Sequence, residues 1–218
     1  MKKFWKNNNL SLVFLGLFLF SLVGQVITGF KEHNEELKED GQTPVTIIHY
    51  LQSGHFLQST FENWESEFLQ MGLFVVLSIG LYQRGSSESK RKDIEEEVDR
   101  EPSSRRHGAP WPVKKGGWVL AVYKNSLTIS LFILFVVSFI AHWYGSCKNY
   151  NEERLIHHQP VQTAWQYITN KRFWFESFQN WQSEFLSVFA IIWLSIYLRQ
   201  KGSPQSKPVD APHYKTGE

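Results

Sequence analysis

Four long apolar runs divide the chain and predict four helices that cross a membrane. They are residues 10–27, 68–82, 127–144 and 185–198. The first and third runs have 18 residues each, and at 1.5 Å per residue such a helix covers roughly 27 Å of a hydrocarbon layer about 30 Å thick. The other two, of about 15 residues, reach only roughly 22 Å and need the polar turn before them to enter the interface. The pattern predicts an all-α integral membrane four-helix bundle.

The composition agrees with a membrane protein once the hydropathy of each apolar run is considered separately. The mean hydropathy of −0.31 averages the apolar runs with long charged connectors, whereas hydropathy within each run decides membrane insertion. Aromatic residues make up 16% of the chain and include nine Trp, which is typical of aromatic belts at two membrane interfaces. The net charge of +2 is too small to indicate a nucleic-acid partner, and the single cysteine, Cys147, excludes an intrachain disulfide.

The second half of the chain repeats the first at an offset of 117 residues. Residues 60–90 and 177–207 are identical at 16 of 31 positions without a gap, and residues 7–90 and 124–207 are identical at 29 of 84. So long a period indicates two domain-sized halves rather than a solenoid. It also predicts that the first apolar run is retained in the mature protein, because its counterpart in mid-chain cannot be a signal peptide.

The repeat and the composition together predict the domain organisation. Two two-span repeats, 1–90 and 118–207, flank a charged cytoplasmic linker, 91–117, and a disordered tail follows at 208–218. Because each repeat has an even number of spans, both enter the membrane in the same sense and are parallel. The polar connector between the spans of each repeat is expected to form a small helical cap outside the membrane.

Turn residues in the first connector predict where its helices begin and end. The first helix should extend beyond the membrane as far as Gly41, and Thr43-Pro44 should open a short helix over 45–52. The helix of the second span should then begin near Phe56, and Ser59 or Thr60 is a further candidate cap.

Positive charges predict the orientation of the spans. Lys and Arg are concentrated at the amino terminus, in the linker and after the fourth run, and they are sparse in the two connectors. Because positive residues mark cytoplasmic segments, both termini and the linker should lie in the cytoplasm. The residues that carry this argument outside the linker are Lys2, Lys3, Lys6, Arg199, Lys201 and Lys207.

A polar stripe on spans two and four is the candidate functional site. Its members recur every three or four residues, so they share a helix face, and polar groups in a span should face protein or water rather than lipid. Glu67 and Glu184 are expected to meet near a pseudo-two-fold axis. The favoured interpretation is structural, with each acid stabilised by a helix amino terminus and hydrogen-bonded across the bundle. The alternative is that the pair binds a cation or proton. The stripe comprises Asn63, Glu67, Gln70, Ser78, Asn180, Glu184, Ser187 and Ser195.

Other reactive residues do not form a recognisable site in the sequence. Histidines cluster in or beside the connectors, but none recurs at the 117-residue offset, so we predict no metal site and no cofactor. The sequence also lacks a glycine-flanked serine, an HExxH motif and a phosphate-binding glycine loop. We therefore predict no catalytic residues and no enzymatic activity.

Several segments resemble one known family. They are NEE (34–36), HFLQSTFENWESEFLQ (55–70), PWPVKKGGW (110–118) and RFWFESFQNWQSEFL (172–186). With these segments the chain resembles an uncharacterised family of bacterial four-span membrane proteins, described only as a domain of unknown function. The resemblance covers nearly the whole chain and implies the bacterial cytoplasmic membrane, but no substrate or catalytic residue.

These observations define two expected functions. The first is a non-enzymatic structural or partner-binding membrane protein, whose partners are the lipid bilayer and either another membrane protein or a second copy of the chain. The alternative is a small transporter or channel that uses the polar stripe around Glu67 and Glu184.

Overall fold

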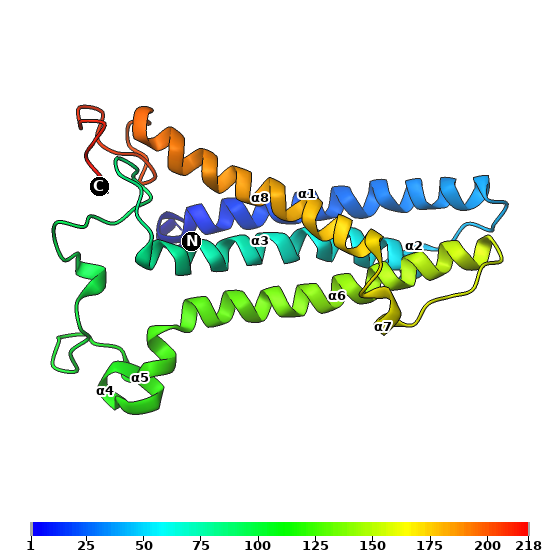
Figure 1. Cartoon of the computed structure of the whole chain (residues 1–218), viewed down its shortest axis with the longest axis horizontal. Helices are drawn as coiled ribbons and strands as arrows, with labels where there is room; N and C mark the ends of the chain where they lie inside the picture. The colour runs from blue at the N-terminus through cyan, green and yellow to red at the C-terminus, as the bar shows by residue number, and fades with distance from the viewer. Residues whose placement is uncertain (1, 218) are drawn as a thin grey trace. The chain divides into compact units, whose positions relative to one another are not determined.

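The chain folds into helices joined by turns in the computed structural model, which describes residues 2–217 and side chains from Phe4 onward (Figure 1). Within residues 2–217 there is no strand, so the all-α prediction is confirmed. The side chains of Lys2 and Lys3, two of the charges used for orientation, lie outside this description. The elements are α1 (Lys2–Glu39), α2 (Ile47–Tyr50), α3 (Gly54–Gly80), a 3-10 turn (Glu97–Asp99), α4 (Trp111–Lys115), α5 (Gly117–Lys124), α6 (Ser126–Ile156), α7 (Ala164–Tyr167) and α8 (Lys171–Tyr197).

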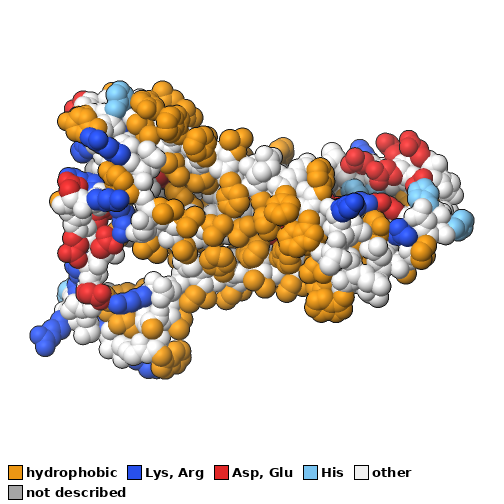
Figure 2. Space-filling view, viewed as in Figure 1, with side chains coloured by type: hydrophobic (Ala, Val, Ile, Leu, Met, Phe, Trp, Pro, Cys, Tyr) orange, Lys and Arg blue, Asp and Glu red, His pale blue; other side chains and the backbone are white. Residues whose placement is uncertain are grey.

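Two helices are long and apolar enough to cross a membrane. They are α1, over Phe4–Glu39, and α6, over Ser126–Ile156. They contain the first and third apolar runs. None of the most apolar 18-residue window of α1 is buried, and only 11% of that of α6. Hydrophobic side chains cover much of the visible helical surface, whereas charged side chains gather in the connecting segments (Figure 2).

The residues separate into two compact units that do not follow the sequence bounds of the two halves. The first unit combines Met1–Phe61 with Ile140–Phe173, and the second combines Glu62–Phe139 with Trp174–Glu218. Each unit therefore contains segments from both halves, unlike the sequence-based division at 90, 117 and 207. The contacts that define a unit join segments far apart in the chain, which a linear division cannot represent.

In the first unit, two asparagines fasten the connectors to the helices that precede them. Asn34 Nδ2 donates to the Val45 carbonyl at 3.2 Å, and Asn34 Oδ1 accepts from the Val45 N–H at 2.7 Å. Asn151 makes the same pair of bonds with Gln162, both at 2.8 Å. Asn34 and Asn151 are 117 residues apart, as are their partners. The NEE segments thus fold each connector back onto its own helix.

The short helices and the start of α3 lie a few residues from their predicted positions. Thr46 caps α2 by accepting from the His49 N–H, so the cap is neither Thr43 nor Pro44. The hydroxyl of Ser53 accepts from the Phe56 N–H at 3.2 Å, and α3 begins at Gly54, two residues before Phe56, so Ser53 rather than Ser59 or Thr60 lies at its start. In each case the choice among several polar residues depends on which side chain can reach a free N–H of the first turn.

Helices α1 and α6 are each followed by a residue in the left-handed backbone conformation, but the residue type differs. After α1, Gly41 adopts the left-handed conformation with φ 72°, as expected from its position at the predicted helix end. After α6, His158 does so with φ 55°, and it lies 117 residues after Gly41. Glycine enters this region at little cost, whereas a side chain is strained there. His158 is exposed.

Helices α3 and α6 approach each other closely at two glycines within the first unit. A Cβ on Gly54 would collide with the backbone of Asn149, and a Cβ on Gly145 would lie 2.6 Å from the Gln58 nitrogen. Two further bonds hold this contact, because Glu152 Oε2 accepts from the Gly54 N–H at 3.3 Å and Asn149 Nδ2 donates to Gln58 Oε1 at 2.9 Å. Small residues permit such backbone packing between helices.

In the second unit, the tail is arranged around Lys207. The Lys207 side chain is 1% exposed, and its Nζ donates to the carbonyls of Gly85, His213 and Lys215. The Thr216 hydroxyl adds a 3.1 Å bond with Tyr82 Oη. The sequence assigns residues 208–218 to a disordered tail, whereas residues 208–217 form turns in the structure and residue 218 lies outside the description. The Pro, Lys and Gly composition gives no sign of these long-range bonds.

Candidate functional site

The polar stripe divides into members that are buried between helices and members that are exposed. Gln70 and Ser78 line a cavity between α3 and α8 in the second unit. Ser195 is buried, and its hydroxyl bonds the Ser86 hydroxyl at 2.9 Å. Asn63 and Glu67 are exposed. The stripe is thus not one continuous polar surface, although every member lies in the second unit.

Two further members of the stripe form hydrogen bonds within their own helix, α8. Asn180 Nδ2 donates to the Glu176 carbonyl at 3.0 Å, and Ser187 Oγ donates to the Glu184 carbonyl at 2.8 Å. Hydroxyls and amides in a helix commonly bond the carbonyl three or four residues earlier. These two side chains therefore contribute to α8 itself rather than to a contact with α3.

The structure brings Glu67 of α3 and Glu184 of α8 together. The two carboxyl groups lie close enough to interact electrostatically. Two neighbouring carboxyl groups can form a hydrogen bond only when one of them carries a proton, because an ionised carboxylate is only an acceptor. The pair therefore has the chemistry to hold one proton or, when both groups are ionised, one cation. Its functional role stays a prediction.

A buried acid that the sequence analysis did not select lies on the same stretch of α3. Glu65 is 0% exposed, and its Oε1 accepts a hydrogen bond from Trp181 Nε1 on α8 at 2.9 Å. The polar stripe was defined mainly by residues that recur in both halves. Glu65 does not recur, because the residue at the 117-residue offset is Gln182. Trp181 does recur, because its counterpart in the first half is Trp64. It could have indicated a nearby acceptor, since a buried indole N–H needs a hydrogen-bond acceptor.

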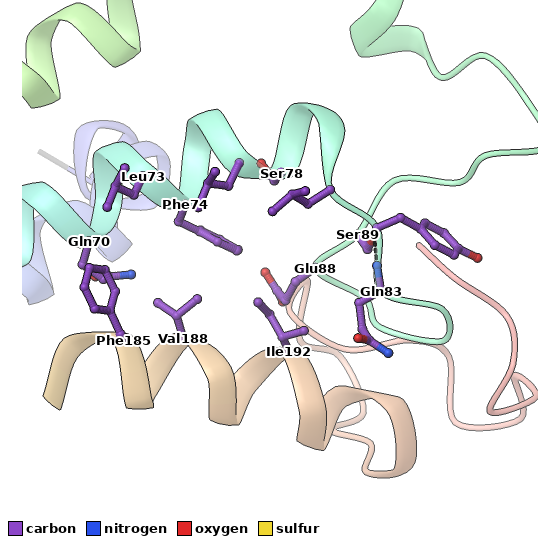
Figure 3. Close-up of a pocket in the computed structure, with 13 residues that line it drawn as sticks. Gln70, Leu73, Phe74, Ser78, Gln83, Glu88, Ser89, Phe185, Val188 and Ile192 are labelled. Carbon is purple, nitrogen blue, oxygen red and sulfur yellow. Dashed lines mark hydrogen bonds between the residues drawn. The ribbon is translucent and has the colours of Figure 1, made fainter. Parts of the chain in front are cut away.

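The cavity itself is a mostly apolar space of about 290 Å³. Figure 3 shows it between α3 and α8, with Gln70 at one end and the loop that carries Gln83, Glu88 and Ser89 at the other. The loop is held in shape by a 3.0 Å bond from the Gln83 N–H to Ser89 Oγ. The apolar lining includes Leu73, Phe74, Leu77, Leu81, Phe185, Val188 and Ile192.

Glu88 is the one ionisable carboxyl group that lines this cavity, and its side chain points inward (Figure 3). Ser87 Oγ donates to Glu88 Oε1 at 3.4 Å. The Gln205 amide, oriented so that its nitrogen faces acceptors, donates to both carboxyl oxygens at 3.0 and 3.3 Å. Burial raises the pKa of Glu88 above its usual range, and the Ser87 bond opposes that rise. The sequence analysis placed Glu88 at the edge of a charged linker and gave it no role.

The raised pKa of Glu88 predicts a pH dependence of stability. A carboxyl whose pKa is higher in the folded state stabilises the fold fully below its unfolded pKa of about 4.5 and loses this contribution as pH rises through the folded pKa. The wild-type melting temperature should therefore fall, relative to that of Glu88→Gln, as pH rises from about 4.5. Thermal unfolding in detergent micelles measures this difference. Glu95→Gln, at an exposed position of the linker, is the control, and parallel profiles for all three proteins would contradict the prediction.

Two histidines of the first unit, His33 and His55, pack against each other. The rings of His33 and His55 are stacked at 5.1 Å, and Tyr50 Oη lies 3.5 Å from His55 Nδ1. Because the nitrogen lone pairs lie in the ring planes, stacked rings do not direct them toward one ion. Tyr50 is fully buried beside these rings. The cluster of His33, Tyr50 and His55 therefore contributes packing within the first unit.

Comparison with known proteins assigns the family. A search of the curated proteins and a search of the solved structures each found no match. A family model does match, and its residue range covers the NEE segments, both helices of the cavity and Glu88. The chain belongs to the family described as "Domain of unknown function (DUF6766)", whose model matches residues 1–218.

Proposed function

We propose that the protein is a four-span protein of the bacterial cytoplasmic membrane, formed by duplication of a two-span unit, with both termini and the linker in the cytoplasm. In this proposal α3 and α8 cross the membrane together with α1 and α6. Its role is structural or partner-binding, without enzymatic activity, and its partners are lipid and either another membrane protein or a second copy of the chain.

The observation that carries this proposal is the exposed apolar surface of α1. Phe20 is 80% exposed and Leu10 is 70% exposed, and no residue of the most apolar window is buried. Contiguous apolar surface of this extent is unfavourable in water and marks a membrane or protein interface. Trp111 and Trp118 support the same interpretation, because both are exposed just before α6, where interfacial tryptophans are expected.

Cysteine accessibility tests the topology. Cys147 is replaced by Ala, and single cysteines are introduced at Gln42 and Ser104, which are exposed positions in the first connector and in the linker. A membrane-impermeant maleimide added to intact cells should label position 42, whereas position 104 should react only after the membrane is opened. Labelling of position 104 from outside would contradict the proposed orientation.

A second candidate function, transport or conduction of a small cation or proton, is favoured by the proximity of Glu67 and Glu184. A proton shared between two helices in a span is a common feature of ion pathways. A conduit requires these side chains to line a wet passage, whereas a structural role requires them to be sealed by mutual bonds.

Reconstitution into liposomes separates the two candidates. For the structural role, proton and cation flux should equal that of protein-free liposomes in the wild type and in the double variant Glu67→Gln, Glu184→Gln. Flux that is present in the wild type, retained in Glu95→Gln and abolished in the double variant would instead establish the conduit.

A further inference from the structure

We propose that the cavity between α3 and α8 binds a small lipophilic cation, with Glu88 as its counter-ion. The ligand class is a molecule with an apolar body and an amine or quaternary ammonium head. This inference concerns the second unit alone, and it rests neither on the number of spans nor on the pair of Glu67 and Glu184.

The size and lining of the cavity define the body of the ligand. Its volume of about 290 Å³ is at the lower end of the range of ligand pockets, roughly 300–1,000 Å³. Apolar side chains from both helices form most of the wall, so the favourable contacts are with hydrocarbon or an aromatic ring. Polar groups are few and are placed at the two ends, where they fix orientation rather than supply affinity along the body.

The charge at the loop end defines the head. Glu88 is the only Asp or Glu among the thirteen lining residues, and no Lys or Arg lines the cavity. An ionised carboxylate that faces an apolar space is costly unless a positive group pairs with it. A cationic head next to Glu88 removes that cost, whereas an anionic head would add repulsion to it.

Aromatic side chains in the wall provide a second means of binding a cation. Phe74, Tyr82 and Phe185 line the cavity, and the faces of such rings attract ammonium groups. The structure already contains one example, because Lys92 Nζ lies 4.5 Å from the centroid of the Tyr82 ring. A quaternary ammonium, which cannot donate hydrogen bonds, is suited to a cavity that offers both aromatic rings and a carboxylate.

The alternative occupant, the acyl chain of a membrane lipid, matches only part of the cavity. An acyl chain would contact Leu73, Phe74 and Val188 but would leave the Glu88 carboxyl facing hydrocarbon. The two occupants differ in their dependence on charge: a lipid groove accepts an alkyl chain whatever its head, whereas the proposed site selects the sign of the head group.

Isothermal titration with two probes of matched chain length and opposite charge tests the proposal. Decyltrimethylammonium and decyl sulfate are titrated into the full-length protein in lipid nanodiscs at about pH 8, well above the usual pKa range of a carboxyl group. Protein-free nanodiscs give the background of partition into lipid. The cation should bind saturably at one site per chain, and decyl sulfate should show only the background.

Three variants assign the binding to this cavity. Glu88→Gln should weaken the cation by at least about tenfold, because it removes the charged partner, and Glu95→Gln should leave the affinity unchanged despite the same change in net charge. Ser78→Phe, which fills the cavity and keeps Glu88, should abolish binding. Equal affinity for the two probes, an unchanged affinity in Glu88→Gln, or binding retained in Ser78→Phe would each overturn the proposal. Should Glu88→Gln fail to fold, the probe comparison and Ser78→Phe still decide the question.

Discussion

Replacing Gly54 by Ala should lower the free energy of unfolding by about 2–3 kcal/mol, although alanine is the better helix former. The added methyl group would collide with the backbone of Asn149, and backbone atoms cannot move aside as the end of a flexible side chain can. Helices α3 and α6 would have to separate, with loss of the bond from the Gly54 N–H to Glu152. Denaturant unfolding in detergent micelles, followed by tryptophan fluorescence, measures the change.

Gly16→Ala is the matched control for this substitution. Gly16 lies within α1, and a Cβ there has no neighbour within 4 Å. The same mutation should therefore be neutral or should stabilise the protein by up to about 1 kcal/mol, through the higher helix propensity of alanine. Gly145→Ala should resemble Gly54→Ala, because its Cβ would lie 2.6 Å from the Gln58 nitrogen. A Gly54→Ala protein as stable as Gly16→Ala would refute the close contact of α3 and α6.

Asn34→Ala and Asn151→Ala should each cost about 1–3 kcal/mol, because each removes two hydrogen bonds at once. The N–H and the carbonyl of Val45 would lose their partner in the first variant, and those of Gln162 in the second. Aspartate keeps the acceptor but removes the donor, so Asn34→Asp and Asn151→Asp should lie between the wild type and the alanine variants. The same unfolding experiment provides these values.

Asn7 provides the control for the asparagine variants. Its side chain is exposed on α1, so Asn7→Ala should change the unfolding free energy by less than about 0.5 kcal/mol. Hydrogen exchange adds a local measure, because the Val45 and Gln162 amides should lose protection only in their own alanine variants. If either amide keeps its protection, the asparagine does not hold that connector.

The helical nature of the chain and the carboxyl-terminal end of its first long helix were readable from the sequence alone. Apolar runs of helical length predicted α1 and α6, and the glycine at position 41 predicted the end of α1, because hydrophobic periodicity and left-handed turns are local properties. Asn34 and Asn151 are also related by the 117-residue offset, and each bonds a segment only 11 residues further along the chain.

Tertiary structure alone decided which polar residues are buried and what they contact. The offset favoured Glu67, which is exposed, over Glu65, which is buried and bonded to Trp181. It also gave no role to Glu88 or Lys207, whose partners Gln205 and Gly85 are more than 100 residues away in the chain. The burial of a charged side chain depends on segments that only folding brings together. A pattern along the chain can state that such a residue needs a partner, but the fold determines which partner it has.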